Sequence, residues 1–486
     1  MKTFFLVLAL SFVVMNNHAQ EKLNETLLIE DFSVLKTITC EIAPSLTAEE
    51  KQELYNQFDK EAKELIGRSM SVIEFFNFLI TNHTQTKLDG HGSLSIPNDI
   101  MVSLLGNEKV LFPIPILIIN DQFVVNTEMA EIPFGSVIKE VNGVPVSTMI
   151  NQFIYENSTF QLRTLERSFD LLYFIKYGAP ESFRIKFQYP NTTELQEINL
   201  SPLDVQLRTK VYDKTIYPLN REKLRNTVNH AFDKSTETYV IQLNSFNWIE
   251  EKLENDYGVF QDKFDQLFKD IKKQKAKNLI IDLRFNMGGN SFIPGLFYSY
   301  IALGDFKEEI YVRVSDFDFP HKEYITKIDG DDVNQRQIGE IIEYSKKVFT
   351  KNDEYFEFTP VNATIHPNKK SFMGDVYLLV GGRTFSASAY FTALFKQEKR
   401  GVMIGEKVGG SHQNVTAGKL IQYTLPNSKI EVVLPIGIIK YVKELEINIP
   451  EKNIIPDILV GENLKYQYLL KKEDWDLREA IKFIGK

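Results

Sequence analysis

The sequence feature that most constrains the fold is the stretch of residues 376–396, in which an apolar run is followed by two glycines and then by a segment of helical periodicity. The run Val-Tyr-Leu-Leu-Val is typical of a buried strand, and Ser386 lies where this strand passes into the helix. Unpaired amide N–H groups at such a junction favour negative charge. Ser386 is therefore either a helix N-cap or a nucleophile whose substrate develops an oxyanion there.

Two more glycine-rich loops follow the same pattern. Residues 278–284 form a strand-like run that leads into Phe-Asn-Met-Gly-Gly, which ends at Gly288 and Gly289, and residues 404–410 read Ile-Gly-Glu-Lys-Val-Gly-Gly. Glycine pairs allow the backbone to turn its N–H groups toward a bound group. Strands and helices alternate from about residue 206 onward, which predicts an α/β catalytic domain.

The order of these three segments resembles peptidase family S41, the C-terminal processing and tricorn-core group of serine peptidases. The resemblance implies a catalytic domain of the ClpP/crotonase-like type that acts on a peptide or protein substrate without a cofactor. It further implies that Ser386 is the nucleophile. Backbone N–H groups of Gly288 or Gly289 and of Ala387 would then form the oxyanion hole.

The general base is not the lysine that the processing branch of the family uses, because that position falls on Ser411. A serine hydroxyl needs a neighbouring base to act as a nucleophile near pH 7. Residues 88–92, Leu-Asp-Gly-His-Gly, resemble the Asp-Gly-His-Thr turn of tricorn-like members, in which the histidine is the base. The resemblance therefore points to His91, and His412, beside the vacant lysine position, is the alternative base.

The acid that would orient the histidine is assigned to Glu451. The segment 451–457, Glu-Lys-Asn-Ile-Ile-Pro-Asp, resembles a late Glu-x-x-Gly-Val-x-Pro-Asp segment of the family, although Asn453 replaces its glycine. A solvated loop carboxylate is the alternative interpretation of Glu451.

The chain as a whole is predicted to be α/β (α+β multidomain). Residues 1–19 are typical of a secretory signal peptide, so we expect export to the periplasm or the extracellular space. Helical periodicity predicts an N-terminal helical region over 20–107. A mostly β segment over 108–205 contains an Asn-Gly turn at Asn142 and resembles a PDZ domain. The catalytic domain spans 206–486, with an insertion at about 306–372.

Composition excludes several classes of function. A single cysteine, Cys40, allows neither an intramolecular disulfide nor a cysteine-based zinc site, and no His-x-x-x-His pair occurs, so we expect no bound metal. The net charge of −9 has no long basic run, which argues against nucleic-acid binding, and no later apolar stretch is long enough to span a membrane. The oligomeric state is not predicted. A catalytically inactive binding protein on the same scaffold is the alternative function, because Phe285 and Met287 depart from the family motif.

Overall fold

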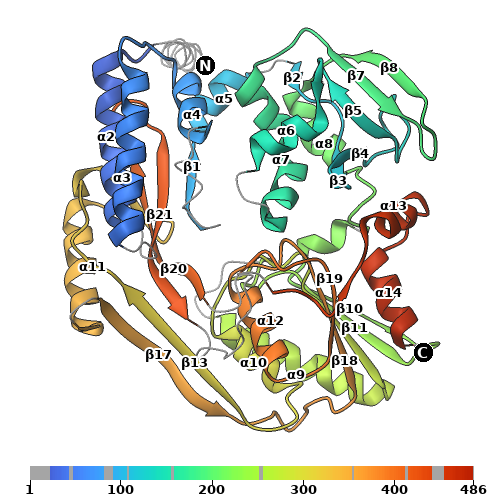
Figure 1. The fold of residues 1–486 in the computed structure, drawn as a ribbon. Helices are drawn as coiled ribbons and strands as arrows, with labels where there is room; N and C mark the ends of the chain where they lie inside the picture. The colour runs from blue at the N-terminus through green and yellow to red at the C-terminus, as the bar shows by residue number, and fades with distance from the viewer. Residues whose placement is uncertain are drawn as a thin grey trace, which may run out of the picture.

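The computed structural model describes residues 22–42, 48–81, 91–106, 109–154, 158–219, 221–250, 256–352, 355–410, 414–440 and 454–484. Figure 1 shows a mixed α/β structure in which separate sheets are each covered by helices. The predicted fold class is therefore confirmed. The proposed domain boundaries remain predictions.

The central element is a six-stranded sheet that carries the glycine-rich loops. Its strand order is β10 (Val228–Asp233), β11 (Thr238–Leu243), β12 (Asn278–Asp282), β18 (Asp375–Val380), β19 (Val402–Gly405) and β22 (Ile458–Leu459). All neighbouring strands from β11 onward are parallel, and only β10 runs antiparallel. The carboxyl ends of parallel strands meet at one edge of a sheet, where ligands commonly bind. The loops after β12 and β18 therefore lie side by side.

Helices cover both faces of this sheet, as parallel strands require. One face packs against α9 (Asp256–Gln274), α10 (Ile293–Ser299) and α12 (Ala387–Gln397) through an apolar core. The other face packs against α13 (Glu462–Leu470) and α14 (Trp475–Ile484). Because both faces are buried, the strands read as nearly continuous apolar runs in the sequence, which is why they were predictable.

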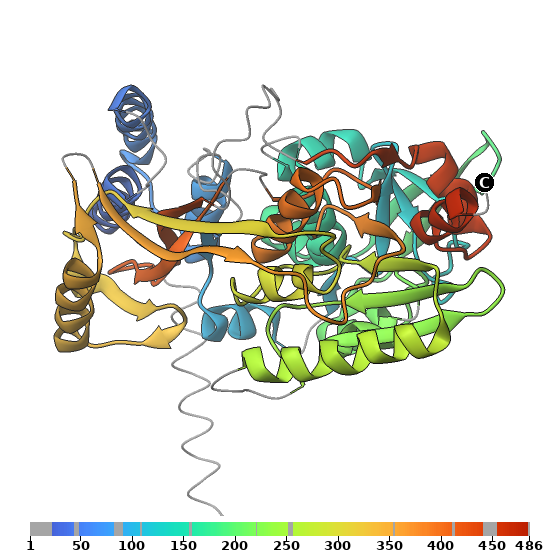
Figure 2. The same ribbon diagram turned by 90° about the horizontal axis from the view of Figure 1, so that it is seen from below.

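A second sheet is antiparallel and carries the N-terminal helices. Its strand order is β15 (Asp331–Asp332), β14 (Ile325–Ile328), β20 (Asn414–Thr424), β21 (Glu431–Lys440), β13 (Phe306–Val314), β17 (Phe356–Ile365) and β16 (Thr350–Lys351), with β1 (Ser93–Ser95) paired to β21. Figures 1 and 2 show β13 and β17 running from the central sheet toward the N-terminal helices. The residues predicted as an insertion thus share a sheet with strands from 414–440.

The third sheet lies in the segment that resembles a PDZ domain. Its order is β3 (Ile116–Ile119), β4 (Gln122–Val125), β5 (Val137–Val141), β7 (Phe183–Gln188) and β8 (Leu195–Leu200), with β6 (Val144–Pro145) paired to β5. Asn142 and Gly143 join β5 to β6 with φ values of 49° and 82°, as a type I′ hairpin turn requires. The helices α6 (Val146–Phe153) and α7 (Thr159–Tyr177) complete this unit, and α7 contributes to its core. We call residues 109–204 the β3–β8 module.

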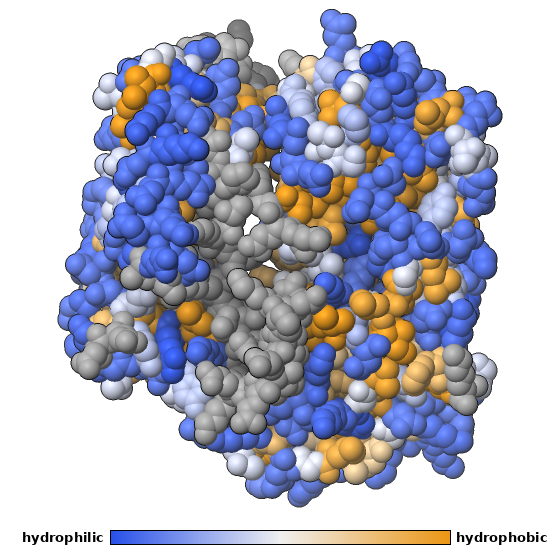
Figure 3. Space-filling model, viewed as in Figure 1, coloured by the Kyte–Doolittle hydropathy of each residue, from blue (hydrophilic) through white to orange (hydrophobic). Residues whose placement is uncertain are grey.

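The remaining elements connect or cover these sheets. They are α2 (Glu25–Ile42), α3 (Ala48–Ala62), α4 (Val72–Thr81), α5 (Asn98–Leu105), α8 (Arg208–Tyr212) and α11 (Gln335–Val348), the short pair β2 (Lys109–Leu111) and β9 (Leu203–Asp204), and the 3₁₀ turns η1 (Lys63–Leu65), η2 (Val205–Leu207), η3 (Arg221–Arg225) and η4 (Lys322–Tyr324). Within the described residues, no helix combines the length and apolarity that crossing a membrane needs. On the face drawn in Figure 3, apolar residues gather toward the middle and hydrophilic residues dominate the outer parts.

Candidate active site

Ser386 has a backbone conformation that a capping serine does not need. It precedes α12 with φ 54° and ψ −126°, whereas N-cap residues usually have β-region dihedrals. Its side chain makes no capping hydrogen bond to the first turn of the helix. A non-glycine residue at positive φ is costly and persists only where the surroundings impose it, commonly at functional sites. The geometry therefore disfavours the N-cap interpretation of this serine.

The loop after β12 presses directly on this serine. A Cβ atom added to Gly288 would lie 2.7 Å from Cβ of Ser386 and 3.0 Å from the amide nitrogen of Ala387. Gly288 itself has φ 105°, which side chains rarely adopt. Only glycine therefore fits here, and the sequence-predicted residues Ser386, Gly288 and Ala387 do lie together.

Asn286 ties the two loops together. It is fully buried, its carbonyl accepts from the amide of Phe385 at 3.1 Å, and its side-chain amide donates to the carbonyl of Leu243 at 3.1 Å. Its side-chain oxygen accepts from the amide of Gly288 at 2.8 Å. The sequence analysis quoted Asn286 within a motif but gave it no role. Its position two residues before Gly288, within a predicted site loop, was the available signal.

The hydrogen bond from Gly288 to Asn286 distinguishes the candidate oxyanion donors. The Gly288 N–H is already engaged, whereas no hydrogen bond from the amide of Gly289 or Ala387 occurs among the described residues. Gly289 forms an isolated parallel bridge with Phe246, in which Phe246 bonds to Gly288 and Asn290 and not to Gly289. The Gly289 N–H therefore points away from Phe246.

His91 lies beside the residue that precedes the candidate nucleophile. Its ring is 4.6 Å from the ring of Phe385, centroid to centroid, with an interplanar angle of 33°. Residues about 295 positions apart in the chain are thus brought to the same place. The two other predicted site residues, His412 and Glu451, lie outside the described residues.

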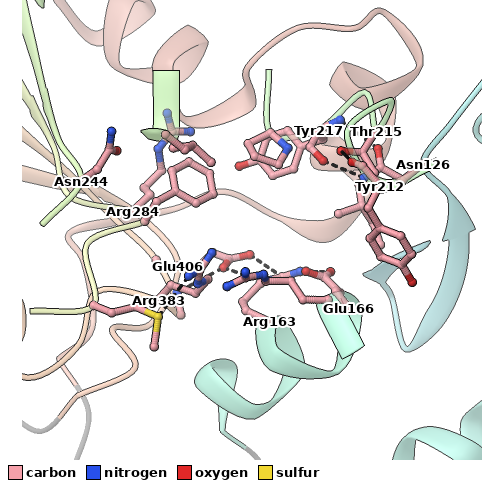
Figure 4. A pocket seen from close by; sticks show the side chains of 18 of the residues that line it. Asn126, Arg163, Glu166, Tyr212, Thr215, Tyr217, Asn244, Arg284, Arg383 and Glu406 are labelled. Atoms are coloured by element: carbon pink, nitrogen blue, oxygen red, sulfur yellow. Dashed lines mark hydrogen bonds and ion pairs between the residues drawn. The ribbon is translucent and has the colours of Figure 1, made fainter. Parts of the chain in front are cut away.

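A cavity of about 670 Å³ opens beside these loops. Gly288, Gly289 and Arg383 line it on one side, and residues of α7 and of the segment around Tyr217 line the other. Figure 4 shows Arg163 of α7 reaching toward Glu406, and Arg383 beside the sulfur atom that it contacts. Because Gly288 and Gly289 line it, a ligand in this cavity would contact the loop that packs against Ser386.

A buried ion cluster joins the β3–β8 module to the central sheet at this cavity. Glu406 accepts from both Arg163, at 2.7 Å and 3.1 Å, and Lys465, at 2.7 Å. Burial alone raises the pKa of the Glu406 carboxyl, but the charges of Arg163 and Lys465 outweigh it and hold that pKa well below its usual range. The sequence analysis quoted Glu406 within the third glycine-rich loop but missed this role.

A second cluster fixes the end of β12. Arg284 pairs with Asp282 at 2.7 Å, and also with Asp474 at 2.6 Å and Asp476 at 3.1 Å. Burial raises the pKa of Asp476 to about 7, although the charge of Arg284 opposes the shift. For Asp474, burial also raises the pKa, but the charge and hydrogen bonds of Arg284 outweigh burial and lower it. Two carboxylates on one guanidinium therefore shift in opposite directions.

Solved structures of other proteins have a similar architecture. Structures of mature CPAF complexed with lactacystin and of mature CPAF are each 14% identical in sequence, cover 95% of this chain and 99% of theirs, and have TM-scores of 0.62 and 0.61. The photosystem II D1 C-terminal processing protease is 14% identical, covers 95% of this chain and 97% of its own, and has a TM-score of 0.43. At this identity the CPAF structures establish a shared fold. No curated protein matches the sequence.

The family match falls on the part of the chain that carries the glycine-rich loops. Residues 237–296 and 299–460 match the model of peptidase family S41. These ranges include Gly288, Gly289 and Glu406, which line the cavity, and Ser386, which lies against Gly288. The sequence match identifies residues 237–296 and 299–460 as a peptidase family S41 domain, and the shared fold and the converging loops agree with it.

Proposed function

We propose that this protein is an exported serine peptidase that hydrolyses peptide bonds of protein or peptide substrates, with Ser386 as nucleophile and His91 as base. The observation that carries the proposal is the backbone of Ser386, held at φ 54° against Gly288 without a capping hydrogen bond. A purely structural serine gains nothing from such strain, whereas a nucleophile on a strained strand-to-helix turn projects its hydroxyl toward a substrate.

The proposed reaction follows from the positions of these groups. The Ser386 Oγ attacks the scissile carbonyl carbon while the imidazole of His91 accepts its proton. The amides of Gly289 and Ala387 stabilise the resulting oxyanion, because they lie in the loop after β12 and at the start of α12. His91 then gives its proton to the leaving amine, and water hydrolyses the acyl-enzyme by the same steps in reverse order.

The β3–β8 module would act as a PDZ-like domain that presents or gates the peptide. Its sheet order leaves β3 and β8 as edges, and an extended peptide can add to a sheet edge as a further strand. Export through the segment 1–19 is part of the same proposal. N-terminal sequencing of secreted protein, expected to start near Gln20, checks it.

A fluorophosphonate probe on the full chain tests the nucleophile. The probe reacts with an activated serine by losing fluoride, so we expect wild type to be labelled and Ser386→Ala to lose labelling entirely. Ser388→Ala is the matched control, because this serine lies two residues away in the same segment. Equal labelling of wild type and Ser386→Ala would overturn the proposal.

The base is tested by comparing His91→Ala with His412→Ala. We expect loss of His91 to slow labelling by about 10³-fold or more, as removal of a triad base does. We expect His412→Ala to retain most of the wild-type rate. The opposite result would transfer the role of base to His412. Absence of labelling and of hydrolysis in wild type would favour the alternative, a peptide-binding protein without activity.

A further inference from the structure

Three regions of the chain meet at the ring of Phe385. Phe160, in the first turn of α7, stacks on it with a centroid distance of 4.5 Å and an interplanar angle of 25°. His91, which precedes β1, contacts the same ring at 4.6 Å and 33°. Phe385 is only 7% exposed, and the next residue is Ser386. The candidate base thus rests on a ring whose second aromatic partner comes from the β3–β8 module.

The first turn of α7 fits closely against the loops that carry the nucleophile. A Cβ on Gly382 would lie 2.5 Å from the carbonyl oxygen of Thr159, and a Cβ on Gly409 would lie 3.0 Å from Cβ of Phe160. The hydroxyl of Thr159 donates to the carbonyl of Lys407 at 2.9 Å. The close approaches at Gly382 and Gly409 leave Phe160 little freedom to shift relative to Phe385.

The backbone alone does not orient the imidazole. Gly92 separates His91 from β1, whose register on β21 begins at Ser93. The side chain of His91 lies before that register, and packing against Phe385 is one contact that restricts its ring. Side chains of catalytic groups must be locked by packing to keep a productive geometry. The ring of Phe385 can hold the imidazole only if its own rotamer is held.

We propose that Phe160 is a positioning residue for the base His91, acting through the ring of Phe385. The inference rests on the proposed function, since it takes His91 as the base and Ser386 as the nucleophile. It adds that the β3–β8 module contributes to the catalytic geometry itself, in addition to any peptide that it presents. A misplacement of about 1 Å in a catalytic group can cost about 10²-fold in rate.

The test compares three variants of the full chain by the rate of fluorophosphonate labelling. Phe160→Leu keeps apolar bulk but removes the ring, and we expect its maximal labelling rate to fall about tenfold or more with little change in the probe concentration for half-saturation. Phe160→Tyr keeps the ring and should restore the rate to within about twofold of wild type. Thr159→Val removes a hydrogen bond of the same contact but no ring, and we expect it to label like wild type.

A second comparison separates positioning from general damage. If Phe160 acts through His91, Phe160→Leu should have no further effect in a His91→Ala background. An equal loss from Phe160→Leu in both backgrounds, or a wild-type rate in the single variant, would overturn the inference. Melting temperatures of all variants verify folding, and Phe160→Tyr carries the test if the leucine variant does not fold: a Tyr rate far below wild type then contradicts the proposal.

The outcomes also separate this inference from the proposed function. Labelling that does not depend on Ser386 defeats both. Labelling that depends on Ser386 and His91 but not on Phe160 defeats the inference alone. Labelling that depends on Ser386 but not on His91 defeats the assignment of the base, and the inference with it, while the nucleophile stands.

Discussion

Ser386 and His91 are positioned in different ways. Ser386 is held by hydrogen bonds from its neighbours to main-chain carbonyls of the loop after β12: the amide of Phe385 donates to the carbonyl of Asn286, and the hydroxyl of Thr384 donates to the carbonyl of Leu283 at 2.8 Å. His91 reaches the same place through ring packing against Phe385. A group fixed by backbone survives small changes in side-chain packing, whereas a group fixed by packing depends on how whole regions dock. The proposed nucleophile should therefore be locally robust, and the proposed base should depend on docking.

The largest expected effect is on the nucleophile side, from Gly288→Ala. Its Cβ would meet Ser386 at 2.7 Å and the Ala387 amide at 3.0 Å, so the oxyanion geometry must shift. We expect the labelling rate to fall by about 10²-fold to 10³-fold, the range seen when an oxyanion donor is lost. Gly67→Ala is the matched control, because Gly67 has φ 74° but no atom within 4 Å of an added Cβ. A full rate in Gly288→Ala would show that this contact is not part of the site.

The next largest effect is expected from Glu406→Gln, which tests how the β3–β8 module docks on the central sheet. The change leaves the buried charges of Arg163 and Lys465 without their shared carboxylate, and breaking such a pair costs about 3–5 kcal/mol of the free energy of unfolding. Urea unfolding measures this change in the free energy of unfolding. Glu462→Gln, at a carboxylate that is 40% exposed and also pairs with Lys465, should cost about 1 kcal/mol or less. Equal effects of the two variants would mean that Glu406 does not hold the module in place.

Asp474 and Asp476, the two carboxylates that pair with Nη1 of Arg284, should make stability depend on pH in opposite directions. The folded-state pKa of Asp476 is about 7, above the ordinary 3.8, so the folded state binds more protons than the unfolded chain between these values and stability from this group falls as pH rises through that window. Asparagine does not titrate, so the Asp476→Asn variant does not lose stability from this position as pH rises. We expect its melting temperature to increase relative to that of wild type between pH 5 and pH 8.

Asp474→Asn is the control with the opposite sign. The lowered pKa of Asp474 contributes stability above about pH 4, the ordinary range for an aspartate, and that contribution is lost as pH falls through the folded-state pKa. The variant should therefore be less stable than wild type at pH 7, with a difference that shrinks on acidification. Parallel pH profiles for the two variants would contradict the assignment of opposite shifts.

The smallest effect is expected from Ser388→Ala. The Ser388 side chain is fully buried and its hydroxyl has no hydrogen-bond partner in the described part of the chain. Removing an unpaired buried hydroxyl from a helix should change the free energy of unfolding by about 0.5 kcal/mol or less and leave labelling unchanged. Thr392→Val, one turn later, removes a hydroxyl that donates to the carbonyl of Ser388 and should cost about 1 kcal/mol. Lost labelling in Ser388→Ala would give this hydroxyl a catalytic role.

Much of the local structure was predictable from the sequence. The expected strand over 278–284 corresponds to β12, and the Asn-Gly turn at Asn142 joins β5 to β6. Each of these depends on periodicity or turn chemistry within a few residues. The loop of Gly288 was predictable for the same reason, since its glycines follow a buried strand directly.

Contacts between distant segments were not predictable. Nothing near Phe160 in the sequence indicates a partner some 225 positions away, and Lys465 carries no motif that links it to Glu406. The residues at 306–372 were predicted as an insertion, and no local pattern indicated that β13 and β17 share a sheet with β20 and β21. Pairing over such distances depends on how whole sheets and helices pack, which one sequence does not encode in any local pattern.

The sequence by itself determined the strand-to-helix turn at Ser386 and the glycine loop beside it, because adjacent residues impose their own backbone conformations. Only the tertiary structure decided that Ser386 is no ordinary N-cap, that Asn286 bonds to Phe385 and Leu243, and that His91 rests on Phe385. The physical reason is the same in each case. These features arise where segments far apart in the chain exclude water and meet, and their cost in conformational entropy is offset only in the packed molecule.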